Sequence, residues 1–484
     1  MIFFFVIYVL LLLAIGAVAG RKQSSSEDFL ISNRTLGGRV AAFSSESTGM
    51  SGWLLLGLPG QIFQKGLSAG WAGWSCILGT FLNWKFIAPR AQEIASKHKF
   101  ISIVDFLAWD DGTSPPIFQL LVRYLSAAGI IFFMTVYTWA QFVALGKALS
   151  LPALGMGLDY SSAVLIGAST IILYSIMGGF KSVVWTDLFQ ALIMAIVFLI
   201  VPIALLFKFL TVGPVANTTE ITESSISLLS LFEGGLSLTA FMVLISGFGI
   251  GAAYTGQPQL FSRYMATKSQ DDVKTGTVTA VVWVALATIG VAAIGVLGNL
   301  VLDTSLVSDP ELIIFEASSA VLPAWMYLIV TAGVAAAVMS SADSFLIASA
   351  TSISHDVPVV RNFASKLPNK TLLPRGVVLL IGLAALVLSY TTNIDATGAV
   401  VFSLASYAWG GLAIAFGIPV VYRLYSKRPK VKFVFLLMFL GVAANVMWHV
   451  TGLSSVLYEV IPIMLIQLLV WLAYEKFTPD SHTI

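Results

Sequence analysis

The chain alternates between long apolar stretches and short polar connections. A stretch of about 20 mostly apolar residues is long enough for a helix to cross a bilayer. Thirteen stretches come close to this length, with ends uncertain by several residues, and the pattern therefore predicts an all-α integral membrane protein with about 13 transmembrane helices. The stretches are 2–19, 40–64, 67–90, 115–146, 159–179, 184–208, 237–258, 275–301, 323–352, 375–391, 398–424, 432–451 and 455–475.

Small and polar residues interrupt two of these stretches in the middle. The first interruption runs from Ser44 to Trp53, and the second runs from Ser246 to Pro258. Backbone that leaves the helical conformation at membrane depth is tolerated only where it is buried in protein or lines a cavity. A pair of interrupted helices in matching places of two halves is typical of the substrate site of a transporter.

Five helices from the second stretch to the sixth would form a first repeat, about residues 40–208, and five from the seventh to the eleventh a second, about 237–424. Five is an odd number, so the two repeats would have opposite orientations in the membrane. This predicts a 5+5 inverted repeat with one extra helix before it and two after it, in a single transporter domain of residues 1–484. Sequence repeats of 20–50 residues are not visible, which argues against a solenoid.

The composition supports a membrane protein. Hydrophobic residues make up 58% of the chain and charged residues only 10%, against about 25% charged residues in soluble domains. The formal net charge of +2 does not indicate a nucleic-acid partner. The single cysteine, Cys76, excludes an intrachain disulfide and a cysteine-based metal cluster. A nucleophile–base pair and a nucleotide-binding loop are not apparent either, so we expect no enzymatic activity, no cofactor and no metal other than a coupling ion.

The distribution of lysine and arginine predicts the orientation of the chain. With the N-terminus outside, only Lys65, Lys147 and Lys208 fall on the outer side. The other basic residues then lie on cytoplasmic loops or inner helix ends, and Arg263 is counted among them. The C-terminus is cytoplasmic in this arrangement, in agreement with an odd number of helices.

Several ionisable and hydroxyl side chains fall at membrane depth, where such residues are costly and usually functional. Glu46 in the first interruption is either a proton carrier or cation ligand, or a carboxylic acid that hydrogen-bonds across the bundle. Asp187 is either functional or a carboxylate at a helix N-terminus, where the helix dipole favours it. A third group contains several hydroxyls on one helical face. It is either a site for an alkali cation, which prefers oxygen ligands, or a set of small residues that allow close helix packing. It consists of Ser340, Ser341, Asp343 and Ser344.

Several motifs resemble those of a known family. The segment Ser51-Gly52-Trp53-Leu54-Leu55-Leu56-Gly57-Leu58-Pro59-Gly60 resembles the break region of the sodium:solute symporters, and most closely that of the sodium/proline symporters. Other matching segments occur in order along nearly the whole chain. They include Asp28-Phe29-Leu30, Asn83-Trp84-Lys85, Gly178-Gly179-Phe180, Trp185-Thr186-Asp187, Gly256-Gln257-Pro258, Ala337-Val338-Met339-Ser340-Ser341 and Ser406-Tyr407-Ala408-Trp409.

The resemblance implies a leucine-transporter-like fold, alternating access and particular ligands. The main sodium site would use the carbonyls of Ser47, Met50 and Ala337 and the hydroxyls of Ser340 and Ser341. A second sodium, held by some family members, would match Asp187, Ser340, Asp343 and Ser344. The solute would lie against residues of the two interruptions and of the fourth stretch. These are Gly49, Ser51, Trp53, Tyr137, Tyr254, Gln257 and Pro258.

Two positions depart from the pattern of the proline symporters. Gly49 stands where they carry an aspartate that matters for sodium coupling. Glu46, about one helical turn away, could supply the missing carboxylate or make the protein proton-coupled. Ile250 stands where they carry a tryptophan, so the wall of the solute site differs.

These observations predict a secondary active symporter in a bacterial cytoplasmic membrane. It would couple inward sodium movement to uptake of proline or a related small amino acid, with no nucleic-acid partner and no obligate protein partner. Two alternatives stay open. One is a proton-coupled symporter of another small organic solute, and the other is a symporter-like sensor subunit with a separate signalling partner. A channel would need a continuous polar stripe along several helices, and the sequence contains only clusters.

Overall fold

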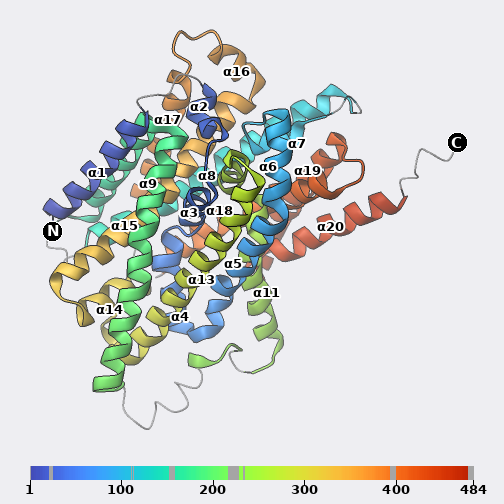
Figure 1. The fold of residues 1–484 in the computed structure, drawn as a ribbon. Helices are drawn as coiled ribbons and strands as arrows, with labels where there is room; N and C mark the ends of the chain where they lie inside the picture. The colour runs from blue at the N-terminus through green and yellow to red at the C-terminus, as the bar shows by residue number, and fades with distance from the viewer. Residues whose placement is uncertain are drawn as a thin grey trace.

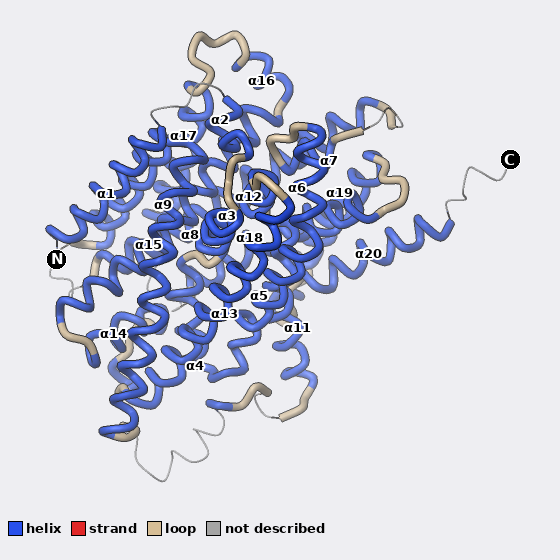
Figure 2. Tube along the Cα trace, in the orientation of Figure 1, coloured by secondary structure: helices blue, strands red, loops and turns tan. Residues whose placement is uncertain are grey.

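The computed structural model describes residues 2–20, 26–110, 112, 114–151, 158–215, 228–232, 235–392 and 399–477. Helices make up almost all of this part of the chain (Figures 1 and 2). The only β contact in it is the isolated bridge between Leu36 and Thr267. Nine helices within the described residues are long and apolar enough to cross a membrane. The protein is therefore an all-helical, multi-pass membrane protein.

The longer helices follow the predicted stretches, except for Pro258–Ala266, which runs past the end of the seventh stretch, and Ile313–Val321, which lies in the predicted connection 302–322. They are α1 (Ile2–Gly20), α3 (Gly38–Gly49), α4 (Leu58–Lys65), α5 (Trp71–Leu82), α6 (Ala88–His98), α8 (Pro116–Leu149), α9 (Tyr160–Val212), α11 (Leu238–Ala252), α12 (Pro258–Ala266), α13 (Gln270–Val301), α14 (Ile313–Val321), α15 (Ala324–Thr351), α17 (Leu372–Tyr390), α18 (Val400–Tyr425), α19 (Val431–Val450) and α20 (Val460–Phe477). Short helices α2 (Ser26–Ile31), α7 (Ile103–Ala108) and α16 (Pro358–Ala364) lie between them.

Both predicted interruptions are breaks in the structure. α3 ends at Gly49, and the chain resumes as a π-helical turn, η2 (Trp53–Gly57), that leads into α4. α11 ends at Ala252, and a 3-10 turn, η6 (Ala253–Gly256), precedes α12. Pro258 occupies the start of α12, where its missing N–H leaves no bond unmade.

The fifth and sixth predicted stretches are joined more tightly than expected. They form one helical run, α9, with a kink at Gly179, whose φ is 55°. A Cβ atom at this position would lie 2.7 Å from the ring of Phe29, so both the backbone conformation and the close approach require glycine. Similarly, the third predicted stretch continues through a π-helical turn, η4 (Asn83–Ile87), into α6 and reaches His98.

The two breaks lie in the interior of the bundle, where Met50 and Tyr254 are buried. α15 packs against α3, α8 and α9, while α18 packs against α8 and the turn η6. α1 lies along α9 at one side of the molecule, and α20 runs outward at the other side towards the C-terminus (Figure 1). Large apolar side chains such as Phe207, Leu210 and Leu380 are exposed on the outside of the bundle. In a membrane these side chains face lipid.

Candidate functional site

The end of α3 leaves backbone carbonyls without helical partners, and α15 supplies hydroxyl groups to them. The hydroxyl of Ser340 donates to the carbonyl of Ser47 at 3.1 Å, and that of Ser341 donates to the carbonyl of Thr48 at 2.9 Å. Each hydroxyl also lies 3.1 Å from the carbonyl oxygen of Ala337. All five residues are buried. This cluster of carbonyl and hydroxyl oxygens fits a hard alkali cation.

The structure thus brings together four of the five residues predicted for the main sodium site. Met50, the fifth, lies beside them at the end of α3, where its N–H donates to the carbonyl of Glu46 at 2.9 Å. The carbonyl that meets Ser341 is that of Thr48. Sequence matching did not select Thr48, although it lies within the same interruption.

Glu46 makes hydrogen bonds between helices, as expected if its role is to link helices across the bundle. Its carboxylate accepts the indole N–H of Trp84 at 2.8 Å and the hydroxyl of Thr80 at 3.1 Å. Both carboxylate oxygens are therefore paired, and the side chain is fully buried. The pairing ties α3 to α5 and η4. A role in carrying a proton or a cation stays a prediction.

Arg263 lies in the last turn of a helix, which agrees with the predicted helix end, but the sequence does not predict its burial. The seventh predicted stretch ends at residue 258, which would leave Arg263 in the connection that follows it. Instead, α12 continues from Pro258 to Ala266 and buries Arg263, of which 1% is exposed. The apolar residues on both sides of it in α12, such as Phe261 and Met265, are the sequence signal that could have located it.

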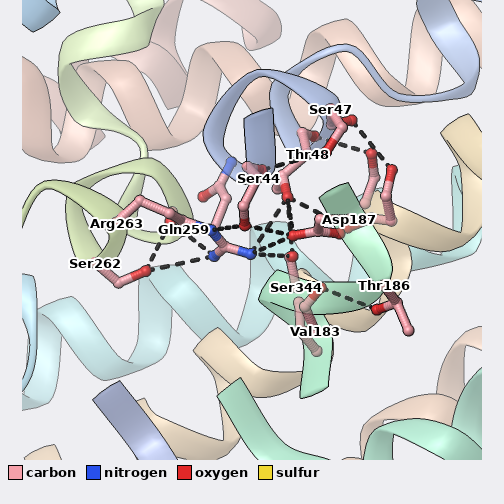
Figure 3. Close-up of polar contacts among 12 residues, drawn as sticks. Ser44, Ser47, Thr48, Val183, Thr186, Asp187, Gln259, Ser262, Arg263 and Ser344 are labelled. Carbon is pink, nitrogen blue, oxygen red and sulfur yellow. Dashed lines mark hydrogen bonds and ion pairs between the residues drawn. The ribbon is translucent and has the colours of Figure 1, made fainter. Parts of the chain in front are cut away.

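The guanidinium of Arg263 gathers oxygen atoms from three other helices (Figure 3). Its Nη2 atom donates to Asp187 Oδ2 of α9 at 3.1 Å and to Ser344 Oγ of α15 at 2.6 Å. It also lies 3.3 Å from the hydroxyl of Thr48, while Nε donates to the hydroxyl of Ser44 at 3.1 Å. Asp187 is the eighth residue after the kink at Gly179, so its interpretation as a carboxylate in the first turn of a helix is wrong.

The four residues predicted for a second sodium have different hydrogen-bond partners in the structure, and they do not form one set of ligands. Asp187 and Ser344 bond to Arg263, and the carbonyl of Ser340 accepts the hydroxyl of Thr48 at 3.3 Å. Asp343 is fully buried, and neither of its carboxylate oxygens has a hydrogen-bond partner among the described residues.

The residues predicted to bind solute lie around the two breaks. The hydroxyl of Ser51 is 3.2 Å from that of Tyr137 on α8, and the indole N–H of Trp53 donates to the carbonyl of Gly49 at 3.2 Å. The hydroxyl of Tyr254 is 3.9 Å from the sulfur of Met50 and so joins the second break to the first. All of these side chains are buried. Gln141, which was not predicted, accepts the N–H of Gly52 at 2.9 Å.

Trp409 of α18 is a further aromatic residue between the breaks. Its ring centroid lies 5.2 Å from that of Tyr254 and 6.2 Å from that of Tyr137, both in edge-to-face geometry. Its indole N–H donates to the carbonyl of Ile250 at 2.9 Å. Gln257 uses its amide to hold backbone carbonyls, including that of Trp409 at 3.0 Å. The motif Ser406-Tyr407-Ala408-Trp409 is visible in the sequence. The contact of Trp409 with the two breaks results from the packing of α18 and could not be predicted from the motif.

Gly49 faces the space between the two breaks. A Cβ atom at this position would lie 3.7 Å from the side chain of Leu260 and 3.8 Å from those of Trp409 and Tyr254. These are ordinary contact distances. A larger side chain at position 49 would therefore project among the residues predicted to bind solute.

A charged cluster ties the loop before α14 to α18. Lys147 at the end of α8 lies 2.7 Å from both Asp309 and Glu311. Glu311 also accepts the backbone N–H of Phe402 at 3.0 Å, and the ring of Phe402 packs edge-on against Trp53. Burial raises the pKa of Glu311, although the charge of Lys147 opposes this shift. The cluster thereby connects the loop before α14, through Phe402, to Trp53, one of the residues predicted to bind solute.

Comparisons with known proteins agree with this architecture. The family model described as "Sodium:solute symporter family" matches residues 29–433. The high-affinity proline transporter PutP of Bacillus subtilis is 32% identical over 456 residues, which cover 93% of this chain and 92% of that protein. The osmoregulated proline transporter OpuE of Bacillus subtilis is 30% identical, covering 98% and 94% of the two chains. The sodium/proline symporter of Escherichia coli is 29% identical, covering 95% and 89%.

Solved structures share the fold. A Na⁺-coupled sialic acid symporter in a substrate-bound outward-open state superposes with a TM-score of 0.66 at 16% identity, covering 91% of this chain and 95% of that chain. Mhp1, a nucleobase-cation-symport-1 family transporter, superposes with a TM-score of 0.51 at 13% identity, covering 90% and 96%. The family match spans most of the sequence, and the described helices carry the same arrangement. The chain belongs to the sodium:solute symporter family and is a sodium-coupled solute symporter, not an enzyme.

Proposed function

We propose that this symporter takes up proline or a related small amino acid together with sodium. The observation that carries the proposal is the meeting of the freed carbonyls of α3 with the hydroxyls of Ser340 and Ser341 on α15. Relatives that are about 30% identical over nearly the whole chain are proline transporters by name, which supports this solute class.

One sodium ion binds between α3 and α15 in this proposal. Its ligands are the carbonyls of Ser47, Met50 and Ala337 and the hydroxyls of Ser340 and Ser341. When sodium binds, the two hydroxyl groups turn their lone pairs to the ion, and the carbonyl oxygens of Ser47 and Ala337, which accept these hydroxyls in the structure, become ligands. The ion then bridges a broken helix to an intact one. It favours the conformation in which the solute site is assembled, and linked sites of this kind are typically coupled by about 1–3 kcal/mol.

The solute binds between the two breaks. Free N–H groups and the positive dipole end of a half-helix suit a substrate carboxylate. The carbonyl-rich opposite side suits the amino group, and the aromatic side chains suit an apolar ring. Trp409 lies in contact with this set. The residues proposed to line the solute site are Gly49, Ser51, Trp53, Tyr137, Tyr254, Gln257 and Pro258.

The helices form a leucine-transporter-like inverted repeat in this proposal. The first repeat, about residues 40–208, runs from α3 to α9, and the second, about 237–424, runs from α11 to α18. α1 precedes the repeats, and α19 and α20 follow them. Each repeat begins with one of the two broken helices, which supports this division. The chain resides in a bacterial cytoplasmic membrane, with the N-terminus outside and the C-terminus in the cytoplasm.

Uptake of labelled proline into proteoliposomes tests the proposal. Separate samples carry an inward sodium gradient, an inward proton gradient or no gradient. We expect uptake above the no-gradient level only with sodium. Uptake driven only by protons would overturn sodium coupling and make Glu46 the proton carrier. If no gradient drives proline uptake, proline is not the solute. A thermal-shift screen of other amino acids and organic acids in the presence of sodium would then identify a different solute.

A further inference from the structure

A largely buried polar cluster lies where the connection between α6 and α8 meets the end of α15. Asp105 belongs to α7, while His355 and Asp356 belong to the π-helical turn η9 (Ser352–Asp356), which follows α15. One ligand atom from each of these three side chains lies within 4.8 Å of the others. Within the residues that the structure describes, no other three histidine, cysteine or acidic side chains form such a group. Because 250 positions separate Asp105 from His355, the sequence does not predict this cluster.

The donor atoms of this cluster are of the types that bind zinc. Nε2 of His355 lies 2.7 Å from Oδ2 of Asp105. Oδ1 of Asp356 accepts the hydroxyl of Ser102 at 2.6 Å, but Oδ2 is buried and has no hydrogen-bond partner among the described residues. A buried carboxylate oxygen without a partner is costly, and a bound cation would satisfy it. One imidazole nitrogen and two carboxylates suit Zn²⁺ better than Mg²⁺ or Ca²⁺, which take oxygen ligands.

The neighbouring arginine pairs with other oxygen atoms of the same carboxylates. Arg123 of α8 donates to Oδ1 of Asp105 at 2.9 Å, and its Nη1 atom lies 4.0 Å from Oδ1 of Asp356. Oδ2 of Asp105 faces His355 and also accepts the backbone N–H of Ile101 at 3.1 Å. Two carboxylates and one guanidinium leave one negative charge in excess when the imidazole is neutral. The cluster therefore attracts a cation, and Arg123 orients the carboxylates without occupying the position between them and the imidazole.

We propose that Asp105, His355 and Asp356 bind a Zn²⁺ ion that bridges α7 and η9. The imidazole coordinates the ion through Nε2 in its neutral form. Zinc holds nitrogen and oxygen ligands at about 2.0–2.2 Å, so the three donor atoms would lie about 3.3 Å apart, and side-chain rotation closes the longest separation by up to about 1.5 Å. Three protein ligands leave the fourth tetrahedral position to a water molecule.

A bridge at this place restrains the helix that carries the proposed sodium ligands. η9 continues directly from α15, on which Ser340 and Ser341 lie, and α7 packs against η9. Alternating access requires each end of the bundle to open in turn. An ion that binds only when α7 and η9 are in contact favours that conformation and slows transport. This consequence for transport rests on the proposed function, whereas the zinc site itself does not.

Zinc binding measured without sodium or solute tests the site directly. The purified full-length chain, freed of any polyhistidine tag, is titrated in lipid nanodiscs with radiolabelled Zn²⁺ in excess Mg²⁺. We expect one bound ion, and a loss of at least about tenfold in affinity in His355→Ala, since even a group that only orients a metal ligand contributes about 10- to 100-fold. His449 provides the control, because its Nε2 atom lies 3.5 Å from Glu459 with no second carboxylate beside it among the described residues. His449→Ala should bind zinc as the unmodified protein does.

Asp356→Asn separates the loss of a ligand from the loss of the fold. The amide oxygen can still accept the hydroxyl of Ser102, so the variant should fold, but an amide is not a usual zinc ligand and the affinity should fall. If His355→Ala does not fold, Asp356→Asn decides the question. An unmodified protein that binds no zinc, or an affinity unchanged in either folded variant, overturns the site.

Uptake measured with and without zinc tests the effect of the bridge. Sodium-driven uptake into proteoliposomes is compared at zero and at saturating Zn²⁺ on both sides of the membrane. We expect zinc to reduce uptake by the unmodified protein and not by His355→Ala. Equal inhibition of both would overturn the bridge, because zinc would then act elsewhere. Zinc binding that depends on His355 supports the site even if no gradient drives uptake, a result that would overturn only the proposed function.

Discussion

The indole N–H of Trp84 donates to the carboxylate of Glu46 at 2.8 Å, and this bond joins the first broken helix to the π-helical turn η4. The second oxygen of the carboxylate accepts the hydroxyl of Thr80. Glu46 therefore has a structural role that does not require it to exchange a proton. The same geometry makes the two roles separable by substitution.

Glu46→Gln should retain sodium-driven solute uptake within about threefold, because the amide oxygen can still accept the Trp84 N–H. Glu46→Ala leaves that N–H buried and unpaired, which costs about 1–3 kcal/mol of stability. Uptake into proteoliposomes and thermal unfolding in detergent measure the two effects. A Glu46→Gln variant that folds but loses all gradient-driven uptake would show that the carboxylate exchanges a proton or binds a cation.

Substituting both Ser340 and Ser341 by alanine should raise the sodium concentration needed for half-maximal uptake. Loss of hydroxyl ligands to a charged group costs about 1.5–3 kcal/mol, which corresponds to about 10- to 150-fold in affinity. Ser349 provides a matched control, because it is buried on the same helix and its hydroxyl has no hydrogen-bond partner among the described residues. Ser349→Ala should leave the sodium dependence unchanged. An unchanged sodium dependence in the double variant would remove the main site from between α3 and α15.

Two glycines should respond differently to the addition of a methyl group. At Gly251 a Cβ atom would lie 2.1 Å from the carbonyl oxygen of Ser75, a backbone atom of the neighbouring α5. Gly251→Ala must therefore separate α5 from α11, at a cost of about 1–3 kcal/mol. Gly49→Ala meets its neighbours at 3.7 Å or more and should fold normally. Thermal unfolding in detergent compares the two variants.

Gly49→Ala should instead affect transport. The added methyl group would lie 3.8 Å from the side chains of Trp409 and Tyr254. If the solute binds against these rings, we expect a higher solute concentration for half-maximal uptake with little change in sodium dependence. Equal loss of stability in Gly49→Ala and Gly251→Ala would contradict the packing described here. A variant at Gly49 with wild-type uptake kinetics would place the solute elsewhere.

The cluster of Lys147 and Glu311 should show strong coupling in a double-mutant cycle. Lys147→Met leaves two carboxylates near one another without a cation, and breaking a buried ion pair costs about 3–5 kcal/mol. Lys147→Met/Glu311→Gln should cost less than the sum of the single variants, since the buried Glu311 is then neutral and only Asp309, whose side chain is 21% exposed, loses its cation. Thermal unfolding at constant pH measures the cycle.

An exposed ion pair provides the comparison for that cycle. Lys274 and Asp271 lie 2.9 Å apart, with side chains 78% and 90% exposed. Such pairs contribute about 0–1 kcal/mol, so Lys274→Met should change stability little. If Lys147→Met is as mild as Lys274→Met, the buried cluster does not hold the loop before α14 to α18.

The sequence alone determined the helices and the two breaks, because both depend on local properties. Length and hydrophobicity specify a transmembrane helix, and small residues with Pro258 specify where one is interrupted. Ser340 and Ser341 could also be selected from the sequence as part of a polar cluster, whereas Ser47, Met50 and Ala337 followed only from the resemblance to the family. The kink at Gly179 was less accessible, because the close approach of Phe29 that requires glycine comes from elsewhere in the chain.

The positions of Arg263 and Trp409 were decided only by the tertiary structure. Arg263 has the charge expected of a cytoplasmic loop or helix end, and only the packing of α12 against α3 and α15 buries it against Asp187 of α9. Trp409 lies in an apolar helix that by itself gives no sign of which face meets the breaks. Hydropathy reports how each segment partitions between water and lipid. It does not report which side chains of separate helices meet, because the rotation and register of each helix are set by packing against its neighbours.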